Sequence, residues 1–369
     1  MSELDALPWR SHSGAPRPKR WALVDDTLNA DRAYKLVCEG TALLWQGDYH
    51  QARQMLQALA RRIEQARARR KAAAPATLLE AFHQHRKAQA ERARILGLLV
   101  LRFEAGHALQ LRRAPDVRAA AEAAIGAADQ PYLASLRELL GWIGAWEWRQ
   151  QGVPVPALGG ARIHPHYGVF SPVRGEYLDL IAQASLPTGA RRAWDIGTGS
   201  GVIAALLARR GLQEVVATDN APAALACAAE TFAHLGLPVR LREADLFPKD
   251  EPPADLIVCN PPWLPGKASS AVETAVYDPD SRMLKGFLAG VGQHLAPRGE
   301  AWLILSDLAE LLGLRSRAEL EAWIAAAGLK VLGRLDIRPR HGKAQDREDP
   351  LHAARSKEVT SLWRLGRAG

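Results

Sequence analysis

The tetrapeptide Asn260-Pro261-Pro262-Trp263 is the stretch of this sequence whose residue types most directly suggest a reaction. An amide or aromatic-amine nitrogen is a poor nucleophile because its lone pair is delocalised, and it must become pyramidal before it attacks a methyl group. The Asn260 side-chain oxygen and the Pro261 carbonyl are two acceptors that can bind its N–H hydrogens and favour that geometry. Pro261 and Pro262 fix backbone angles, so little reorganisation is needed during reaction. The tetrapeptide therefore predicts methyl transfer to a planar nitrogen.

Trp263 adds a flat apolar face beside these acceptors. A nucleic-acid base stacked on it would gain about 1–3 kcal/mol, whereas a glutamine amide would gain less and would still be oriented. The plainer interpretation is a loop with two prolines and a buried tryptophan. The apolar run Leu256–Cys259 directly before the tetrapeptide is typical of a buried parallel strand, and this position favours the chemical interpretation.

A glycine-rich turn between a strand-like run and a helix-like run predicts a cofactor site. Asp195 ends the strand-like run, and the apolar run Val202–Arg209 begins after the turn Gly197-Thr198-Gly199-Ser200-Gly201. Glycines let the backbone approach a ligand closely, and the amides that open a helix can face polar or anionic groups. The Gly-x-Gly-x-Gly spacing, two residues after an acid, differs from the Gly-x-Gly-x-x-Gly of dinucleotide sites. It fits a sulfonium amino acid better, so the predicted cofactor is S-adenosylmethionine.

Two further acids follow the next two strand-like runs. Asp219, followed by Asn220, is placed to accept hydrogen bonds from both ribose hydroxyls. Asp245 can accept from the adenine amino group, while Leu246 covers the ring. Asp219 alone could instead be a helix N-cap, but three acids after successive strands favour the cofactor interpretation. The predicted cofactor site comprises Asp195, Gly197, Thr198, Gly199, Gly201, Asp219, Asn220, Asp245, Leu246 and Asn260.

Strand-like and helix-like runs alternate in the second half of the chain, as in an α/β doubly wound parallel sheet. Helices are expected between the first five strand-like runs, and the last two could form an antiparallel hairpin at one edge. The strand-like runs are Ala193–Ile196, Glu214–Thr218, Val239–Glu243, Leu256–Cys259, Glu300–Leu305, Leu329–Ile337 and Val359–Leu365.

The first part of the chain has a different pattern. Residues 1–20 contain proline and arginine without a period and are predicted to be a disordered arm. Residues 21–150 are rich in Ala, Leu, Arg, Gln and Glu and are predicted to be an all-α substrate- or partner-recognition domain of four to six helices. The proline- and glycine-rich stretch Gln150–Gly160 is the best boundary, so the catalytic domain is expected over 151–369.

Composition limits the cellular compartment and the kinds of site that are expected. Three scattered cysteines suit a reducing compartment rather than a disulfide framework. The N-terminus lacks the apolar core of a signal peptide, and no apolar run approaches ~20 residues, so a cytoplasmic location without a membrane span is expected. His164 and His166 flank a proline and have no acidic or cysteine cluster beside them, so no metal site is expected.

Positive charge is concentrated in residues 61–118, which hold 14 Lys and Arg against 5 Asp and Glu. Such a basic stretch can meet RNA phosphates or an acidic protein face. The alternative is a solvated helical surface, and composition alone favours neither.

Residues from about 160 to 369 resemble the class I S-adenosylmethionine-dependent methyltransferases. The tetrapeptide Asn260–Trp263 narrows the resemblance to enzymes that methylate exocyclic amino nitrogens of bases, such as adenine N6, or the side-chain amide of glutamine. The release factor glutamine N5-methyltransferases are the most similar group, with a helical domain first and a Pro-Arg-x-Glu-like segment before the cofactor strand. Here Gly168–Tyr177 corresponds to that segment, with Val173 inserted, and Trp263 stands where that group has tyrosine.

The resemblance implies a Rossmann-like seven-stranded methyltransferase sheet behind the N-terminal all-α domain. The substrate is then a macromolecule, either a protein such as a translation factor or RNA or DNA. The basic stretch and Trp263 favour nucleic acid, whereas the domain order favours protein. An alternative is a binding module with a degenerate methyltransferase domain, against which stand the intact residues Asp195, Gly197, Gly199, Asp219 and Asn260. The oligomeric state does not follow from the sequence.

Overall fold

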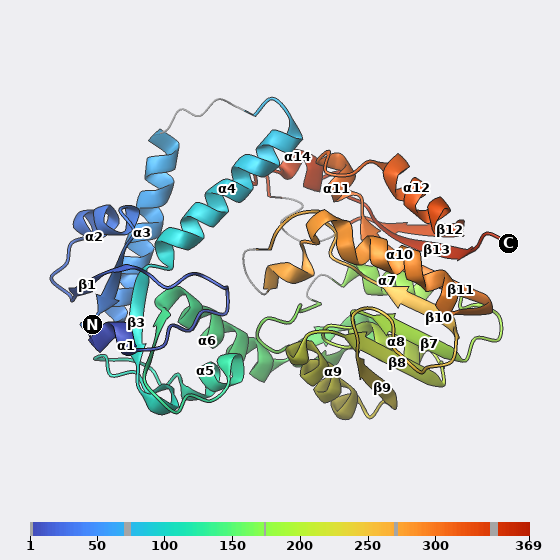
Figure 1. The fold of residues 1–369 in the computed structure, drawn as a ribbon, viewed down its shortest axis with the longest axis horizontal. Helices are drawn as coiled ribbons and strands as arrows, with labels where there is room; N and C mark the ends of the chain where they lie inside the picture. The colour runs from blue at the N-terminus through green and yellow to red at the C-terminus, as the bar shows by residue number, and fades with distance from the viewer. Residues whose placement is uncertain (1–2, 70–74, 173–174, 269–271, 340–345) are drawn as a thin grey trace. The chain divides into compact units, whose positions relative to one another are not determined.

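The computed structural model describes residues 3–69, 75–172, 175–268, 272–339 and 346–369 (Figure 1). The chain divides into two compact units, Met1–Ala76 with His83–Glu147 and Thr77–Phe82 with Trp148–Gly369. The second unit contains the whole of the predicted site.

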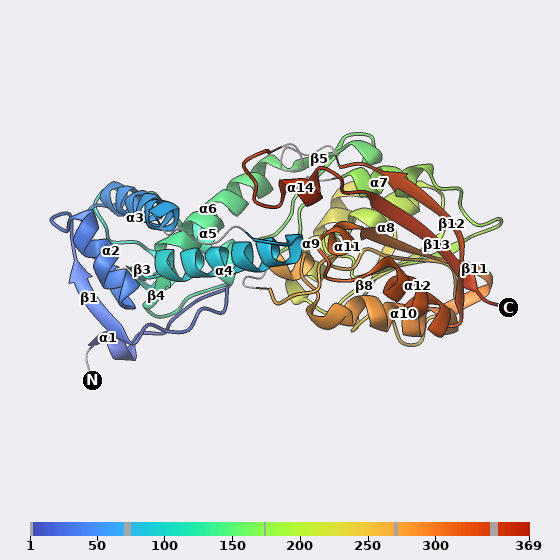
Figure 2. The ribbon, with the colours of Figure 1, turned by 90° about the horizontal axis from the view of Figure 1, so that it is seen from above.

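The second unit is built on a seven-stranded sheet with the order β12-β13-β11-β10-β7-β8-β9, whose strands are labelled in Figure 1. Figure 2 shows β12, β13 and β11 of this sheet from above. All pairs are parallel except those of β13, which runs antiparallel to both β11 and β12. The predicted doubly wound α/β sheet and the antiparallel pairing of its last two strands at one edge are therefore confirmed. The strands are β7 (Arg192–Ile196), β8 (Glu214–Asp219), β9 (Val239–Glu243), β10 (Ala254–Cys259), β11 (Leu295–Ser306), β12 (Leu329–Ile337) and β13 (Thr360–Arg367).

Helices cover both faces of this sheet. One layer contains α7 (Glu176–Gln183), α8 (Val202–Arg209) and α9 (Pro222–Leu235), and the other contains α10 (Arg282–His294) and α12 (Arg317–Ala326). The helix expected between the third and fourth strands is absent, and β9 reaches β10 through turns. Pro248, Pro252 and Pro253 lie in that connection, and proline interrupts helical hydrogen bonding.

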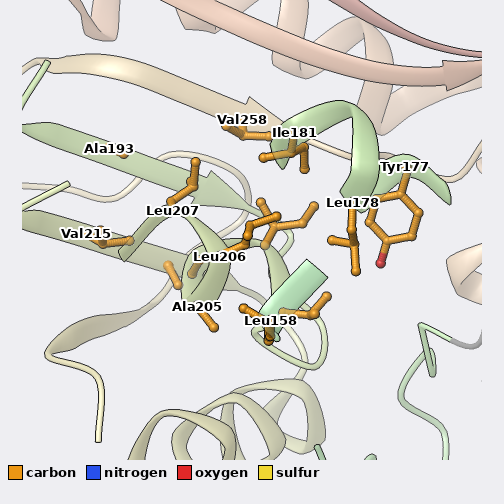
Figure 3. Packing of buried hydrophobic residues seen from close by; sticks show 14 of the residues in the cluster. Leu158, Tyr177, Leu178, Ile181, Ala193, Ala205, Leu206, Leu207, Val215 and Val258 are labelled. Atoms are coloured by element: carbon orange, nitrogen blue, oxygen red, sulfur yellow. The ribbon is translucent and has the colours of Figure 1, made fainter. Parts of the chain in front are cut away.

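The strand side chains alternate between two cores. Ala193, Val215 and Val258 pack under α7 and α8, and Figure 3 shows them with Leu206 and Leu207 of α8. Their chain neighbours face the α10 layer, among them Trp194. Because both faces are covered, the strands read as nearly continuous apolar runs, which is the reason they could be recognised.

Shorter elements complete the second unit. β5 (Val153–Val155) and β6 (Ala161–Ile163) form an antiparallel pair ahead of α7, and α11 (Leu308–Leu311) and α14 (His352–Arg355) are single turns. Among the helices of the described residues, none combines the length and the apolar character that crossing a bilayer requires.

The prediction of an all-α N-terminal domain is wrong. The first unit contains a four-stranded sheet of the order β1-β2-β3-β4, in which β1, β2 and β3 are parallel and β4 is antiparallel to β3. The strands are β1 (Arg20–Val24), β2 (Thr41–Trp45), β3 (Leu99–Phe103) and β4 (Tyr132–Ser135). The helices that follow or connect them are α2 (Ala30–Cys38), α3 (Tyr49–Arg69), α4 (Leu78–Leu96), α5 (Arg118–Ile125) and α6 (Leu136–Gln151).

The error has a physical cause. Leu43 and Leu44 lie in β2, which has only five residues, and four of these are buried. A buried apolar run of this length shows no period that separates strand from helix, and the flanking stretches are strong helix formers.

The segment before β1 is also ordered, contrary to the predicted disordered arm. It begins with the short helix α1 (Glu3–Ala6), and its backbone then pairs with Leu133 of β4. The Leu133 N–H donates to the Pro8 carbonyl and the Arg10 N–H donates to the Leu133 carbonyl, both at 2.9 Å. Farther along, the buried Glu138 carboxylate accepts from the Ser11 hydroxyl at 2.8 Å and from the Ser13 hydroxyl at 2.7 Å.

Glu138→Ala tests this anchor. The change leaves buried hydroxyl and amide donors without an acceptor, so we expect unfolding of the first unit to become easier by about 1–3 kcal/mol. Proteolysis between residues 8 and 20 should accelerate, as followed by mass spectrometry of the intact chain. Glu122→Ala, which removes an exposed acid from α5, is the matched control. Equal cleavage rates in the two variants would show that Glu138 does not hold the segment.

Candidate active site

Parallel pairing brings the predicted site residues to one edge of the sheet. Ile196 at the end of β7 pairs with Cys259 at the end of β10 and with Thr218 near the end of β8. The glycine turn, Asn260 and Asp219 therefore leave neighbouring strands at the same level. In open α/β sheets, ligands bind at the carboxyl ends of the strands.

The turn after β7 depends on glycine for two different reasons. Gly201 has a φ of +80°, and a Cβ there would lie 2.8 Å from the Phe232 ring and 3.2 Å from the Ala228 Cα of α9. Gly199 has a φ of +54°, and a Cβ there would meet no described atom within 4 Å. Gly201 thus lets α8 pack closely against α9, whereas the backbone at Gly199 leaves room for a ligand to approach.

Asp195 supports this turn from inside. Its carboxylate is fully buried, and Oδ2 accepts hydrogen bonds from the Thr198 hydroxyl at 2.6 Å and the Ala204 N–H at 3.1 Å. Oδ1 is buried and has no hydrogen-bond partner among the residues that the structure describes. Burial raises the pKa of Asp195 to about 7, and the negative charge of Asp219 adds to the shift. Asp195 and Thr198, predicted to contact the cofactor, thus bond to each other, and Asp195 also bonds to the first turn of α8.

The raised pKa of Asp195 predicts a pH dependence of stability. The ordinary pKa is 3.8, so between about pH 4 and pH 7 the folded chain binds more protons than the unfolded chain. The free energy of unfolding therefore decreases as the pH rises through this window. Asp195→Asn removes the titration, so from pH 4 to pH 8 the variant should gain up to about 4 kcal/mol relative to the wild type. Urea unfolding without cofactor at pH 4, 6 and 8 measures this difference, and a constant difference would contradict the assignment.

Asp219 links the ends of β7 and β8. Its Oδ2 accepts from the Gly199 N–H and its Oδ1 accepts from the Ala221 N–H, both at 3.0 Å. The N-cap of α9 is Ala221, so Asp219 is not the helix cap that its sequence position allowed. Each carboxylate oxygen keeps a further lone pair for a hydroxyl donor. Asn220, which follows it, is exposed.

The residues after β9 make contacts that the sequence did not predict. Asp245 is exposed and forms an ion pair with Arg282, the first residue of α10. The Leu246 carbonyl accepts from the Thr218 hydroxyl at 2.7 Å, and its side chain packs against Gly286 of α10. The φ of Leu246 is +76°, which is rare for a bulky residue and typical of backbone held in place at functional sites. No pattern in the sequence predicted that Arg282 would lie at this site.

The tetrapeptide after β10 is closed by an internal hydrogen bond. The Trp263 indole Nε1–H donates to the Asn260 Oδ1 at 2.9 Å. Asn260 and Trp263 are partly exposed, whereas Pro261 is buried. From the sequence, the Asn260 oxygen was predicted to be a free acceptor and Trp263 a flat apolar face. The structure shows that the Trp263 indole already occupies one lone pair of this oxygen.

Asp278 holds the segment that follows the tetrapeptide in place. This residue was not predicted to belong to the site. It is buried, and its carboxylate accepts from the Met283 N–H at 3.0 Å and the Leu284 N–H at 3.1 Å, the first turn of α10. Its own N–H donates to the Leu264 carbonyl at 2.9 Å. The signal was available, because an aspartate just ahead of an apolar helical run is a typical helix start.

Part of the Gly168–Tyr177 segment can be placed. Val173 and Arg174 lie outside the described residues, and Glu176 is the first residue of α7. Tyr177 is buried, and burial raises the pKa of its hydroxyl, with the Asp195 charge as the second cause. The start of α7, at the end of this segment, is therefore close to Asp195, which supports the glycine turn.

Comparisons with known proteins show which proteins this chain resembles. A family model described as methyltransferase small domain matches residues 160–311. The release factor glutamine methyltransferase of Cereibacter sphaeroides is 35% identical over 177 residues, which is 43% of this chain and 61% of that protein. The protein of the same name from Deinococcus radiodurans is 40% identical over 160 residues, covering 40% of this chain and 55% of that protein.

A third relative is matched over more of its length. The release factor glutamine methyltransferase of Xylella fastidiosa, strain 9a5c, is 33% identical over 205 residues, which is 50% of this chain and 72% of that protein. The chain spans less than two thirds of the length of the other two relatives.

Proposed function

We propose that this chain methylates the side-chain amide nitrogen of a glutamine in a protein. The chain belongs to the family of S-adenosylmethionine-dependent methyltransferases that includes the release factor glutamine methyltransferases. One observation carries the proposal. Asn260-Pro261-Pro262-Trp263 directly follows β10, and β10 pairs with the strand that runs into the glycine turn. An acceptor for the substrate nitrogen thus lies next to the predicted methyl-donor site.

The residues at this edge fit S-adenosylmethionine. Within the described parts of the chain, the space in front of Gly199 is open and buried Asp195 Oδ1 has no partner, while Asp219 keeps lone pairs for hydroxyl donors. When bound, the cofactor supplies a methyl group that its sulfonium has already activated. The residues predicted to hold it are Gly197, Thr198, Gly199, Gly201, Asp219, Asn220, Asp245 and Leu246, with Asp195 supporting the turn beneath.

The side chains and backbone of this site bind and orient the substrate nitrogen. The Asn260 Oδ1 accepts one N–H hydrogen and the Pro261 carbonyl accepts the other, so the nitrogen lone pair points away from both. These acceptors favour a pyramidal nitrogen over the planar ground state, and a contact that strengthens in the transition state raises the rate. Pro261 and Pro262 hold the acceptors in place before the substrate arrives.

The relatives favour a protein substrate over a nucleic acid. All three named above are described as release factor glutamine methyltransferases, which suggests a translation factor as the partner. The basic stretch 61–118 gives weaker support to nucleic acid than its composition suggested. In the described residues, acids neutralise six of its arginines, in the pairs Arg62–Asp31, Arg92–Glu64, Arg102–Glu104, Arg112–Asp26, Arg113–Asp48 and Arg118–Asp116.

A degenerate methyltransferase domain is the less favoured alternative. Asp195 accepts one hydrogen bond from Thr198 in the turn and one from Ala204 in α8, and Asp219 bonds to the Gly199 N–H. A chain that had lost its cofactor would have no need to keep these contacts together with the open approach at Gly199. These features support an active enzyme.

Labelling with tritiated S-adenosylmethionine tests the substrate class. The protein is incubated with the cofactor and a bacterial lysate, and portions are then treated with nuclease or with protease. We expect macromolecular label that survives nuclease and is lost to protease, and label added by Asn260→Ala that is lower by at least about 100-fold. Label lost to nuclease would replace the protein substrate with RNA or DNA.

A further inference from the structure

The hydrogen bond between Trp263 and Asn260 determines which way the Asn260 amide faces. An indole N–H is a donor without acceptor capacity, so the atom 2.9 Å from Nε1 must be the amide oxygen rather than the amide nitrogen. The two ends of an asparagine amide differ in chemistry, since Oδ1 accepts and Nδ2 donates. Only one orientation presents an acceptor to a substrate N–H.

Trp263 is itself held by packing. Its ring lies against the core under α7 and α8 and also against the core under α10 and α12, and it remains partly exposed. Directly after it, the Leu264 N–H donates to the Val276 carbonyl at 3.1 Å, and the Asp278 N–H donates to the Leu264 carbonyl. The donor that orients Asn260 thus sits on a side chain supported by both layers and followed by a fixed backbone.

We infer that Trp263 is a positioning residue, whose indole N–H keeps Asn260 Oδ1 as the atom offered to the substrate nitrogen. This inference rests on the proposed function of Asn260. The carbonyl oxygen has two lone pairs, so the bond from Trp263 leaves one for a substrate N–H. Without the indole donor, the amide can rotate by half a turn and present Nδ2, which repels a substrate N–H.

Trp263→Phe removes the donor and keeps an aromatic ring. We expect kcat for protein methylation to fall by about three- to tenfold, the range that one hydrogen bond of ordinary strength supports, with the cofactor Kd unchanged. In an Asn260→Ala background the same change should have no further effect, because no amide remains to be oriented. Trp323→Phe is the matched control, since Trp323 is a partly buried tryptophan on the α10 and α12 side without a bond to Asn260.

The hydrogen bond can be observed without measuring activity. The full-length protein labelled with ¹⁵N at its tryptophans and saturated with S-adenosylmethionine gives indole N–H signals, and the one lost in Trp263→Phe belongs to Trp263. We expect this signal to shift and its hydrogen to exchange faster with solvent in Asn260→Ala.

The outcomes separate this inference from the proposed function. An unchanged Trp263 signal in Asn260→Ala, or full kcat in Trp263→Phe, overturns the positioning role. An additional loss of activity from Trp263→Phe in the Asn260→Ala background, beyond that of Trp323→Phe, also overturns it. If Asn260→Ala alone keeps full activity, the proposed role of Asn260 is what fails, and the indole signal still reports whether the bond exists.

Discussion

Asn260→Ala is expected to lower methyl transfer by about 100- to 1,000-fold, the loss typical when one hydrogen-bonding group that acts in the transition state is removed. The acceptor that favours a pyramidal nitrogen is lost, while the glycine turn and Asp219 are untouched. The cofactor Kd should therefore stay within about twofold, since a contact made mainly in the transition state contributes little to ground-state binding. Calorimetric titration with S-adenosylmethionine and single-turnover labelling measure the two quantities separately.

Two results would contradict this prediction. Loss of cofactor binding in Asn260→Ala would mean that Asn260 acts on the cofactor rather than on the substrate. A methyl-transfer rate within a fewfold of the wild type would mean that the substrate nitrogen is oriented elsewhere. Asn260→Asp is a useful companion, because it keeps an acceptor for the Trp263 indole and for the substrate.

Asp219→Ala is expected to weaken cofactor binding by about 1–3 kcal/mol for the lost ribose acceptor alone, which corresponds to a Kd larger by roughly 5- to 150-fold. The structure adds a second cause. Asp219 accepts from the Gly199 N–H, so its removal also frees the turn that the cofactor must meet. The variant should still fold, because Asp219 is only partly buried at the end of its strand.

Asp255→Ala is the matched control for this prediction. Asp255 Oδ2 accepts from the Arg191 and Arg192 N–H groups, each at 2.9 Å, at the opposite edge of the same sheet. Both substitutions remove an aspartate that accepts two backbone hydrogen bonds. The cofactor Kd should rise in Asp219→Ala and stay unchanged in Asp255→Ala, and equal behaviour of the two variants would show that Asp219 has only a structural role.

The sequence was most informative where burial on both faces makes strands apolar throughout. All seven strands of the second sheet were predicted near their observed positions, and so was the antiparallel final strand. The acids and glycines at the ends of these strands could then be predicted to lie close together, because parallel strands end at the same edge of the sheet. The short buried strands of the first unit gave no such signal, since runs such as Thr41–Trp45 are too brief to show a period.

Side-chain partners were harder to predict than elements. The sequence placed Asp245 beside adenine but gave no sign of its pairing with Arg282, which lies 37 residues away. It placed Asn260 and Trp263 in the site, yet the bond between them depends on the turn that two prolines impose. Composition also made residues 61–118 look strongly basic, because three of the acids that neutralise them lie earlier in the chain, at Asp26, Asp31 and Asp48.

The most direct test of the account is the chemical identity of the methylated nitrogen. Protein labelled from [methyl-¹⁴C]S-adenosylmethionine is hydrolysed in strong acid, which cleaves a side-chain amide and releases its nitrogen together with any methyl group on it. Methylation of a glutamine amide predicts that the label distils as volatile methylamine once the hydrolysate is made alkaline, and that Asn260→Ala lowers this label by at least about 100-fold. Label that remains in a non-volatile methylated amino acid or base would contradict the account.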